Sequence, residues 1–186
     1  MHKIKAIIKN LLIEFLYKVQ MNKQIVASKP SDVHLSITDN CCLRCKMCDI
    51  WKLKDKQKDL DYKTAKKIID KLVKWLNNDF QLTFAGGEPF LNKDFIKIIS
   101  YANQKSIKTS TNSNAYIINK ILAKKIVKSG LTQIFFSVDG LEKEHNFIRG
   151  KQDSFQRIIK AIGYLQKEKA GNNSPKIFIN TVISNN

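Results

Sequence analysis

The stretch VHLSITDNCCLRCKMC, residues 33–48, joins an alternation of apolar and polar residues to a cluster of cysteines. The alternation over residues 33–38 predicts a short β-strand. All four cysteines of the chain follow it between Cys41 and Cys48. Cysteines of a disulfide framework are spread along a chain, whereas so tight a cluster is typical of a metal site. The sequence therefore predicts a strand that leads into a metal-binding loop.

The spacing of the cysteines narrows the kind of metal. Four-thiolate zinc fits poorly, because adjacent side chains at Cys41 and Cys42 point apart and a second CxxC is missing. A ferredoxin pattern fails because its fourth position is Lys52. The trio Cys41, Cys45 and Cys48, at C-x3-C-x2-C spacing, would leave one iron of a 4Fe–4S cluster open for chemistry. The evenly spaced trio that uses Cys42 in place of Cys41 stays open, as do incidental or redox cysteines, but we assign Cys42 as a non-ligand.

Strand and helix patterns alternate along the rest of the chain. Asp61 is expected to cap one helix and Asn92 another, and Gly130 suits the left-handed position beyond the end of a third. Such repeats build a parallel sheet with right-handed crossovers, which places the chain in the α/β class. The expected strands are residues 33–38, 80–84, 107–111, 131–138 and 177–183.

Unusual polar segments follow the first four of these strands. In parallel sheets the carboxyl ends of the strands share one edge, and that edge is where ligands bind. Glycines allow close approach of the backbone, and carbonyls at a strand end can accept a hydrogen bond from an ammonium group. A plain turn is the alternative for the second segment. After the cysteines, the segments are Gly86-Gly87-Glu88-Pro89, Thr111-Asn112-Ser113 and Ser137-Val138-Asp139-Gly140.

Together these motifs resemble the signature of the radical S-adenosylmethionine (radical SAM) superfamily. The resemblance extends from residue 33 to the C-terminal end of the chain. The peptide-modifying (SPASM-type) and molybdenum-cofactor-synthesis members are among the types that it resembles. The resemblance implies a partial TIM-like (βα)n barrel with about five βα units present.

The same resemblance implies two cofactors, a 4Fe–4S cluster and S-adenosylmethionine (SAM). Reductive cleavage of SAM would give a 5′-deoxyadenosyl radical that abstracts a hydrogen atom from a substrate, either a peptide or a small molecule. An electron donor of the flavodoxin or ferredoxin type and a cytoplasmic, reducing setting follow from this chemistry. The cluster ligands and catalytic residues would be Cys41, Cys45 and Cys48.

Residues that the resemblance assigns to SAM binding come from every motif. Met47 stands where relatives usually carry an aromatic near the adenine, and its thioether can make the same apolar contact. Thr111 and Ser137 would bind the methionine or ribose part. Arg149 could pair with the SAM carboxylate, with anchoring of its own loop as the alternative. The full set is Met47, Gly86, Gly87, Glu88, Thr111, Ser137, Asp139 and Arg149.

The first 30 residues are predicted to form an amphipathic helix and a linker, ahead of a core domain over residues 31–186. Packing of this helix against the domain is preferred, and contact with a membrane surface is the alternative. Lys9 and Asn10 interrupt the apolar stretch, which argues against a signal peptide. No apolar run reaches the roughly 18 residues of a membrane span.

The net charge of +17, from 33 Lys and Arg against 16 Asp and Glu, raises a basic nucleic-acid-binding module as an alternative. It ranks low because only Arg44, Arg149 and Arg157 are arginines and no aromatic residues interleave with them. A further alternative is an inactive or fragmentary iron–sulfur and SAM-binding remnant. We expect a chain truncated after its fifth strand, without the sixth βα unit or the C-terminal cysteine extension of relatives.

Overall fold

The computed structural model describes residues 29–169, 171 and 173–183, together with residues 8, 11, 12, 14, 15 and 18. Contacts group the chain into two compact units, Met1–Ser31 and Asp32–Asn186, and each is considered by itself. The described residues between 8 and 18 are helical, and the remainder of the predicted amphipathic helix lies outside the described residues. Within the described part of the chain, no helix is long and apolar enough to cross a membrane.

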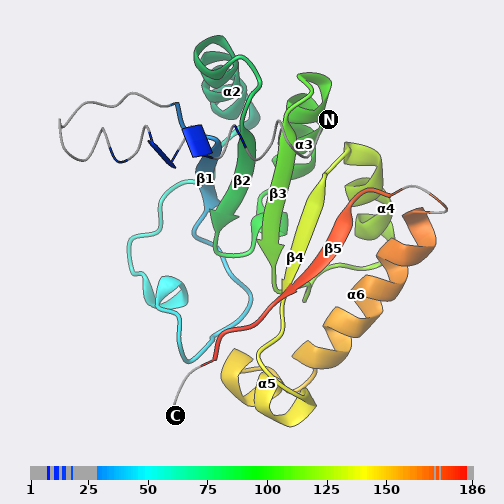
Figure 1. Cartoon of the computed structure of the whole chain (residues 1–186). Coiled ribbons are helices and arrows are strands. Elements are labelled where there is room, and N and C mark those ends of the chain that lie inside the picture. The colour runs from blue at the N-terminus through cyan, green and yellow to red at the C-terminus, as the bar shows by residue number, and fades with distance from the viewer. Residues whose placement is uncertain are drawn as a thin grey trace. The chain divides into compact units, whose positions relative to one another are not determined.

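The second unit contains one sheet of five parallel strands in chain order, which Figure 1 shows from β1 to β5. Each strand pairs with the next in the sequence. Because every right-handed crossover advances in the same direction, the helices fall on one face and the sheet curls into part of a (βα) barrel. The predicted α/β fold is confirmed. The strands are β1 (Asp32–Thr38), β2 (Gln81–Gly86), β3 (Lys108–Ser113), β4 (Gln133–Ser137) and β5 (Lys176–Asn180).

Helices connect these strands, and two short 3-10 turns precede the longer helices in the first two connections. The turns are η1 (Ile50–Lys52) and η2 (Pro89–Leu91). The helices are α2 (Tyr62–Leu76), α3 (Phe95–Gln104), α4 (Lys120–Ser129), α5 (Glu142–Arg149) and α6 (Ser154–Lys169).

Local capping signals decide several of these ends. The Asp61 carboxylate accepts a hydrogen bond from the backbone N–H of Thr64, as predicted. Gly130 ends α4 in the left-handed conformation, at φ 79°, also as predicted.

The N-cap of α3 is Asp94, two residues later than the predicted position Asn92. Asn92 still caps the turn that leads into α3, because its Oδ1 accepts a hydrogen bond from the backbone N–H of Asp94 at 2.8 Å. The amino group of the same buried side chain donates to the carbonyls of Ile37 at 2.9 Å and Leu60 at 3.0 Å. One amide therefore serves the entry to α3 and two backbone carbonyls of other segments.

The core lies between the sheet and its helix layer. Leu82, Phe84, Ile134 and Phe136 from the central strands are fully buried, and the Phe84 ring meets the Phe95 ring edge-on at 5.1 Å. Burial of each such side chain contributes roughly 1.5–3 kcal/mol. This packing fixes the strand ends from which the polar segments emerge.

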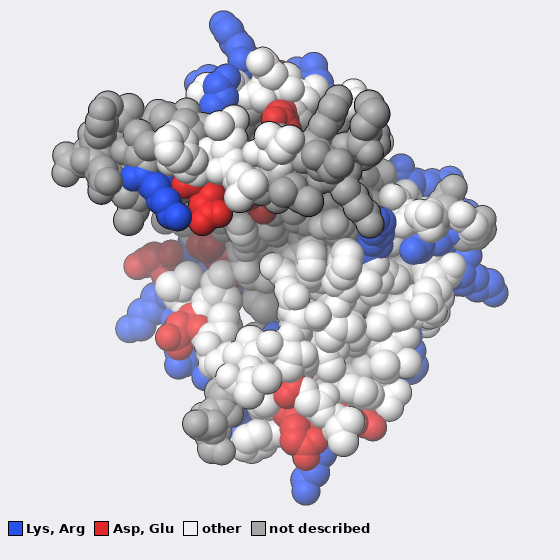
Figure 2. All heavy atoms as spheres, in the orientation of Figure 1, with Lys and Arg blue, Asp and Glu red and all other residues white. Residues whose placement is uncertain are grey.

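The last strand, β5, lies at an edge of the sheet and pairs only with β4 among the described residues. Its Phe178 and Ile179 side chains are exposed. Figure 2 shows that the surface over β4 and β5 is largely uncharged, with Lys and Arg around its margin. Among the described residues, β5 therefore presents one edge without a strand partner.

Candidate functional site

A cavity of about 210 Å³, here called the cysteine cavity, opens at the carboxyl ends of the strands. Its lining comes from the loop after β1, the ends of β2, β3 and β4, and the end of α5. Parallel topology brings these segments together, as the sequence predicts. The lining residues are Cys41, Cys45, Cys48, Ile50, Gly86, Gly87, Asn112, Ser113, Asn114, Ser137 and Arg149.

All four cysteines are free thiols, and three of them line this cavity. Cys42 is the exception: its sulfur lies 3.8 Å from the side-chain oxygen of Asn114. Among the described residues, no three His, Cys, Asp or Glu side chains lie close enough together to hold a single metal ion. Three cysteines that line one cavity without converging on one point are better suited to a multi-atom cofactor. Soft thiolates are the ligands that iron–sulfur clusters prefer. The residues present therefore fit a 4Fe–4S cluster.

The adjacent cysteines also differ in acidity. A hydrogen bond from the Cys42 thiol lowers the pKa of Cys41 to about 6, and the same contact raises the pKa of Cys42. Burial raises the pKa of Cys45, and the nearby Arg149 guanidinium opposes this effect. The adjacent thiols thus share one hydrogen bond, in which ionisation of one favours the protonated form of the other.

Backbone contacts hold the cysteine loop against the C-terminal end of α5. The N–H of Lys46 donates to the carbonyl of Ile148 at 2.9 Å. The Trp51 indole N–H donates to the carbonyl of Cys45 at 3.1 Å. A β-carbon at Gly150, which has φ +69°, would lie 2.8 Å from the carbonyl oxygen of Arg44. The close approach at Gly150 thus requires a glycine.

The two glycines after β2 line the cavity, but their close approach is to protein backbone. A β-carbon at Gly86 would lie 2.2 Å from the Thr38 carbonyl oxygen, and one at Gly87 would lie 2.2 Å from that of Asn40. The N–H groups of Gly87 and Glu88 donate to these same two carbonyls at 2.7 Å. The glycines therefore allow β2 to extend along the segment that leads into the cysteines.

Glu88 is fully buried and lies outside the cavity lining. Its carboxylate accepts hydrogen bonds from the Ser113 hydroxyl at 2.9 Å, the Asn114 N–H at 2.8 Å and the Phe90 N–H at 3.3 Å. Burial raises the pKa of Glu88 to about 7, although these hydrogen bonds oppose the shift. The carboxylate thus ties the end of β2 to the end of β3.

The structure places Thr111 and Ser137 differently. Thr111 is fully buried, and its hydroxyl donates to the Phe84 carbonyl at 3.2 Å inside the sheet. Ser137 lines the cavity. Because β3 extends two residues beyond Thr111, where the strand was expected to end, the rim residues of this strand are Asn112, Ser113 and Asn114.

Met47 is exposed and is absent from the cavity lining, where Ile50 supplies an apolar side chain. The sequence motifs included Asn112 and Ser113 at the end of β3 but missed Ile50 and Asn114. The apolar Ile50 directly after the cysteine segment was the available signal.

Asp139 and Arg149 form an ion pair at the cavity wall. Arg149 Nε lies 2.6 Å from Asp139 Oδ2, and both side chains are nearly buried. The approach has the distance of an ion pair but not the direction of a hydrogen bond. Arg149 Nη1 also lies 3.7 Å from the Cys45 sulfur, and Asp139 Oδ1 accepts from the Val182 N–H at 3.2 Å. The Arg149 guanidinium therefore faces both its own anchor and the cysteine cavity.

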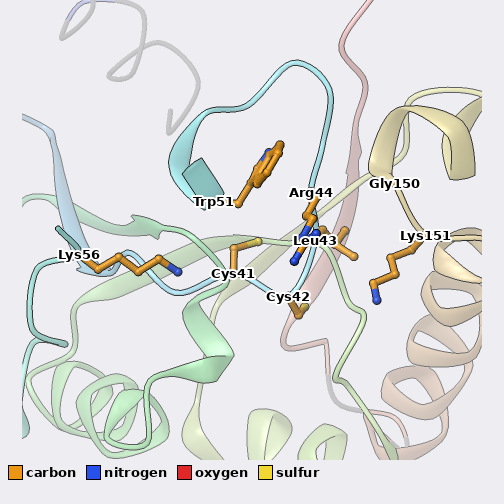
Figure 3. Close-up of a pocket in the computed structure, with 8 residues that line it drawn as sticks. All are labelled: Cys41, Cys42, Leu43, Arg44, Trp51, Lys56, Gly150 and Lys151. Atoms are coloured by element: carbon orange, nitrogen blue, oxygen red, sulfur yellow. The ribbon is translucent and has the colours of Figure 1, made fainter. Parts of the chain in front are cut away.

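A second cavity of about 540 Å³, the basic pocket, lies beside the first and shares Cys41 with it. Its lining contains Arg44, Lys56 and Lys151 and no acidic residue. Figure 3 shows Lys56 and Lys151 on opposite sides of the two adjacent cysteines. None of the ion pairs found among the described residues involves these three cations. The full lining is Cys41, Cys42, Leu43, Arg44, Trp51, Lys56, Gly150 and Lys151.

Comparison with known proteins identifies relatives of this arrangement. The profile of the Radical SAM superfamily matches residues 35–183. An uncharacterized protein, MJ0907 of Methanocaldococcus jannaschii, is 38% identical over 58% of this chain and 38% of its own length. Fe-coproporphyrin III synthase of Methanosarcina barkeri is 27% identical over 78% of this chain and 36% of its own. GTP 3′,8-cyclase of Aliarcobacter butzleri is 29% identical over 81% and 46%. The chain thus spans less than half the length of these relatives.

Solved structures share the fold. SuiB of Streptococcus suis, bound to the precursor peptide SuiA, has a TM-score of 0.70 at 22% identity and covers 90% of this chain and 36% of that protein. Native anSMEcpe with bound AdoMet has a TM-score of 0.63 at 20% identity, over 82% of this chain and 43% of that one. At this identity the likeness establishes the architecture.

Proposed function

This chain belongs to the radical SAM superfamily, and from that premise we propose that it binds a 4Fe–4S cluster and SAM for radical chemistry on a substrate. The observation that carries the proposal is the shared lining of one cavity by Cys41, Cys45 and Cys48. When bound, the two groups supply the reductive cleavage of SAM to methionine and a 5′-deoxyadenosyl radical, which abstracts a substrate hydrogen atom.

The three cysteines would be the cluster ligands, with Cys42 outside the ligand set. The position of Cys42 outside the cavity lining supports this division.

The strand ends would hold SAM. We propose that backbone carbonyls of Gly86 and Gly87 accept hydrogen bonds from the SAM amino group, and that Ser137 and Arg149 bind its polar parts. Support comes from the presence of all four residues in the cavity lining. Asp139 would act by holding the Arg149 side chain at the wall.

Three further residues would support the SAM site or contact its adenine. Glu88 would act by holding the end of β3, since its carboxylate bonds to Ser113 and Asn114. Thr111 would support the same strand from inside the sheet. Ile50, which lines the cavity, is better placed than the exposed Met47 for an apolar contact with adenine.

The basic pocket would receive an acidic electron donor of the flavodoxin or ferredoxin type. Arg44, Lys56 and Lys151 present positive charge next to Cys41, and a net charge of +17 attracts an acidic protein over a longer range. Complementary charge raises the rate of encounter more than the affinity. A cytoplasmic, reducing setting belongs to the same proposal.

The relatives carry names that span tetrapyrrole, nucleotide and peptide chemistry. What the chain has in common with these relatives is the segment that matches the Radical SAM superfamily profile, residues 35–183. We therefore propose only the class of substrate, a peptide or a small molecule, and no individual compound.

The test is anaerobic reconstitution with iron and sulfide, followed by reduction with dithionite in the presence of SAM. We expect about four irons per chain and formation of 5′-deoxyadenosine, measured by mass spectrometry. Cys45→Ala should abolish both, because it removes a ligand at the cavity wall. The matched control Cys42→Ala should preserve both.

Two results would contradict the proposal. Retention of the cluster by Cys41→Ala and its loss from Cys42→Ala would overturn the ligand assignment. A wild-type chain that binds the cluster and SAM without cleaving SAM would be the inactive remnant instead.

A further inference from the structure

The amide of Asn114 faces the cysteine sulfurs from the turn after β3. Its Nδ2 lies 3.6 Å from Cys41 Sγ and 3.7 Å from Cys42 Sγ, within hydrogen-bonding distance for sulfur. The Asn114 side chain is buried, so the amide exchanges these contacts little with water. None of the motifs in the sequence singles out this residue.

The orientation of the amide is fixed by its other end. Asn114 Oδ1 accepts a hydrogen bond from the backbone N–H of Tyr116 at 2.9 Å. A backbone N–H can only donate, so the atom that faces it must be the oxygen, and the amino group must point toward the cysteines. The donor to Cys41 is therefore assigned by the hydrogen-bond network.

The backbone of Asn114 is held from the neighbouring strand. Its N–H donates to the buried Glu88 carboxylate at 2.8 Å, and the preceding Ser113 hydroxyl donates to the same carboxylate at 2.9 Å. A fully buried carboxylate with two partners on one turn leaves that turn little freedom. The end of β2 thus sets the position of a donor that emerges from β3.

We infer that Asn114 is a positioning residue that makes the cluster easier to reduce by donating a hydrogen bond to the Cys41 sulfur. This inference rests on the proposed function, since it requires Cys41 to be a ligand. A hydrogen bond to a ligand sulfur stabilises the reduced cluster more than the oxidised one, because the sulfur carries more negative charge after reduction. Arg149 lies at a similar distance, 3.7 Å, from the Cys45 sulfur, so donors on two walls face two ligands.

The experiment compares reduction of the cluster in three variants by an EPR-monitored redox titration, with iron content measured in parallel. Asn114→Leu removes the donor. Asn114→Ser also removes it but can keep the turn, because a hydroxyl at this position can accept from Tyr116 as Ser113 Oγ accepts from the Ala115 N–H at 3.0 Å. Asn112→Leu is the matched control, since Asn112 lines the same cavity but its amide oxygen accepts from Asn180 at 2.9 Å.

Both Asn114 variants should bind wild-type iron and have a midpoint potential more negative by about 59 mV, which is a tenfold change for a one-electron couple. Asn112→Leu should keep the wild-type potential. An unchanged potential in Asn114→Ser with full iron content would overturn the inference, even if Asn114→Leu failed to fold. An equal shift in Asn112→Leu would also overturn it. A wild-type chain without a cluster would instead overturn the proposed function, and this inference with it.

Discussion

The cysteine cavity and the basic pocket lie on two sides of one loop and differ in their charge. The cysteine cavity is lined by thiols, glycines, amides and hydroxyls, and its guanidinium at Arg149 is paired with Asp139. The basic pocket carries three cations and no acidic residue in its lining. A charge-balanced interior suits a cofactor that carries a positive sulfonium, whereas the basic pocket suits an anionic partner. Under the proposed function, one loop would serve two binding events that differ in their electrostatic character.

The largest expected effect comes from breaking the charge balance of the cysteine cavity. Asp139→Ala leaves the nearly buried Arg149 guanidinium without its partner, which should lower the free energy of unfolding by roughly 3–5 kcal/mol. Urea unfolding of the iron-free protein under reducing conditions measures this. The double variant Asp139→Ala with Arg149→Met should recover most of the loss, and an equal loss in both proteins would show that the ion pair is unimportant.

A smaller loss is expected from filling the contact at Gly87. In Gly87→Ala the new methyl group meets the Asn40 carbonyl oxygen at 2.2 Å, so the backbone must shift at a cost of roughly 1–3 kcal/mol. The cysteine loop should move with it and bind less iron. Gly163→Ala is the control, because nothing lies within 4 Å of the added methyl in α6, and it should stabilise by roughly 0.5–1 kcal/mol. Equal effects of the two substitutions would contradict the steric argument.

Charge reversal in the basic pocket tests the difference between the two cavities, because it changes the charge on one side of the cysteine loop only. Lys56→Glu with Lys151→Glu should slow reduction of the cluster by a flavodoxin hydroquinone roughly tenfold at low salt, because the encounter loses its attraction. Stopped-flow absorbance measures this rate. Reduction by excess dithionite at high salt is the control and should stay near the wild-type rate. Equal slowing with both reductants would place the damage at the cluster and not at the docking surface.

A pH dependence of the stability is expected at Glu88. Burial raises its pKa from 4.5 to about 7, so the folded chain keeps a proton in this range that the unfolded chain has lost. The contribution of Glu88 to the free energy of unfolding should therefore fall as the pH rises from 4.5 to 7. Urea unfolding of wild type and Glu88→Gln at both ends of this range tests the sign. A wild-type advantage that grows toward pH 7 would contradict it.

Local signals predicted much of the fold. Capping by Asp61 and the left-handed end at Gly130 depend on residues close in sequence, and both are present. The alternation of strands and helices indicated the parallel sheet because hydrophobic periodicity reflects which face is buried. The N-cap of α3 falls at Asp94, two residues after Asn92. The amino group of Asn92 finds partners on β1 and in the segment before α2, which no local pattern reveals.

The sequence predicted which segments of the chain meet at the site. It did not predict which side chains of those segments face the cavity. Cysteines, glycines and Ser137 meet in the cavity because parallel strands end at one edge. Glu88 points into protein, where its carboxylate accepts from Ser113 and Asn114, partners that are distant in sequence. Asn114 faces the sulfurs from the turn after β3, a strand that runs two residues further than the sequence indicated. Each residue added to a strand reverses the direction of the next side chain, so a small error in length changes which residues face a ligand.

Cys41 lines both the cysteine cavity and the basic pocket, so the wall between them is one residue thick at that point. Electron tunnelling slows steeply with the distance to be crossed. A donor seated over the cations would stand a single side chain away from the proposed cluster. The thickness of this wall, more than the strength of any contact, would then decide how quickly the centre can be recharged between turnovers.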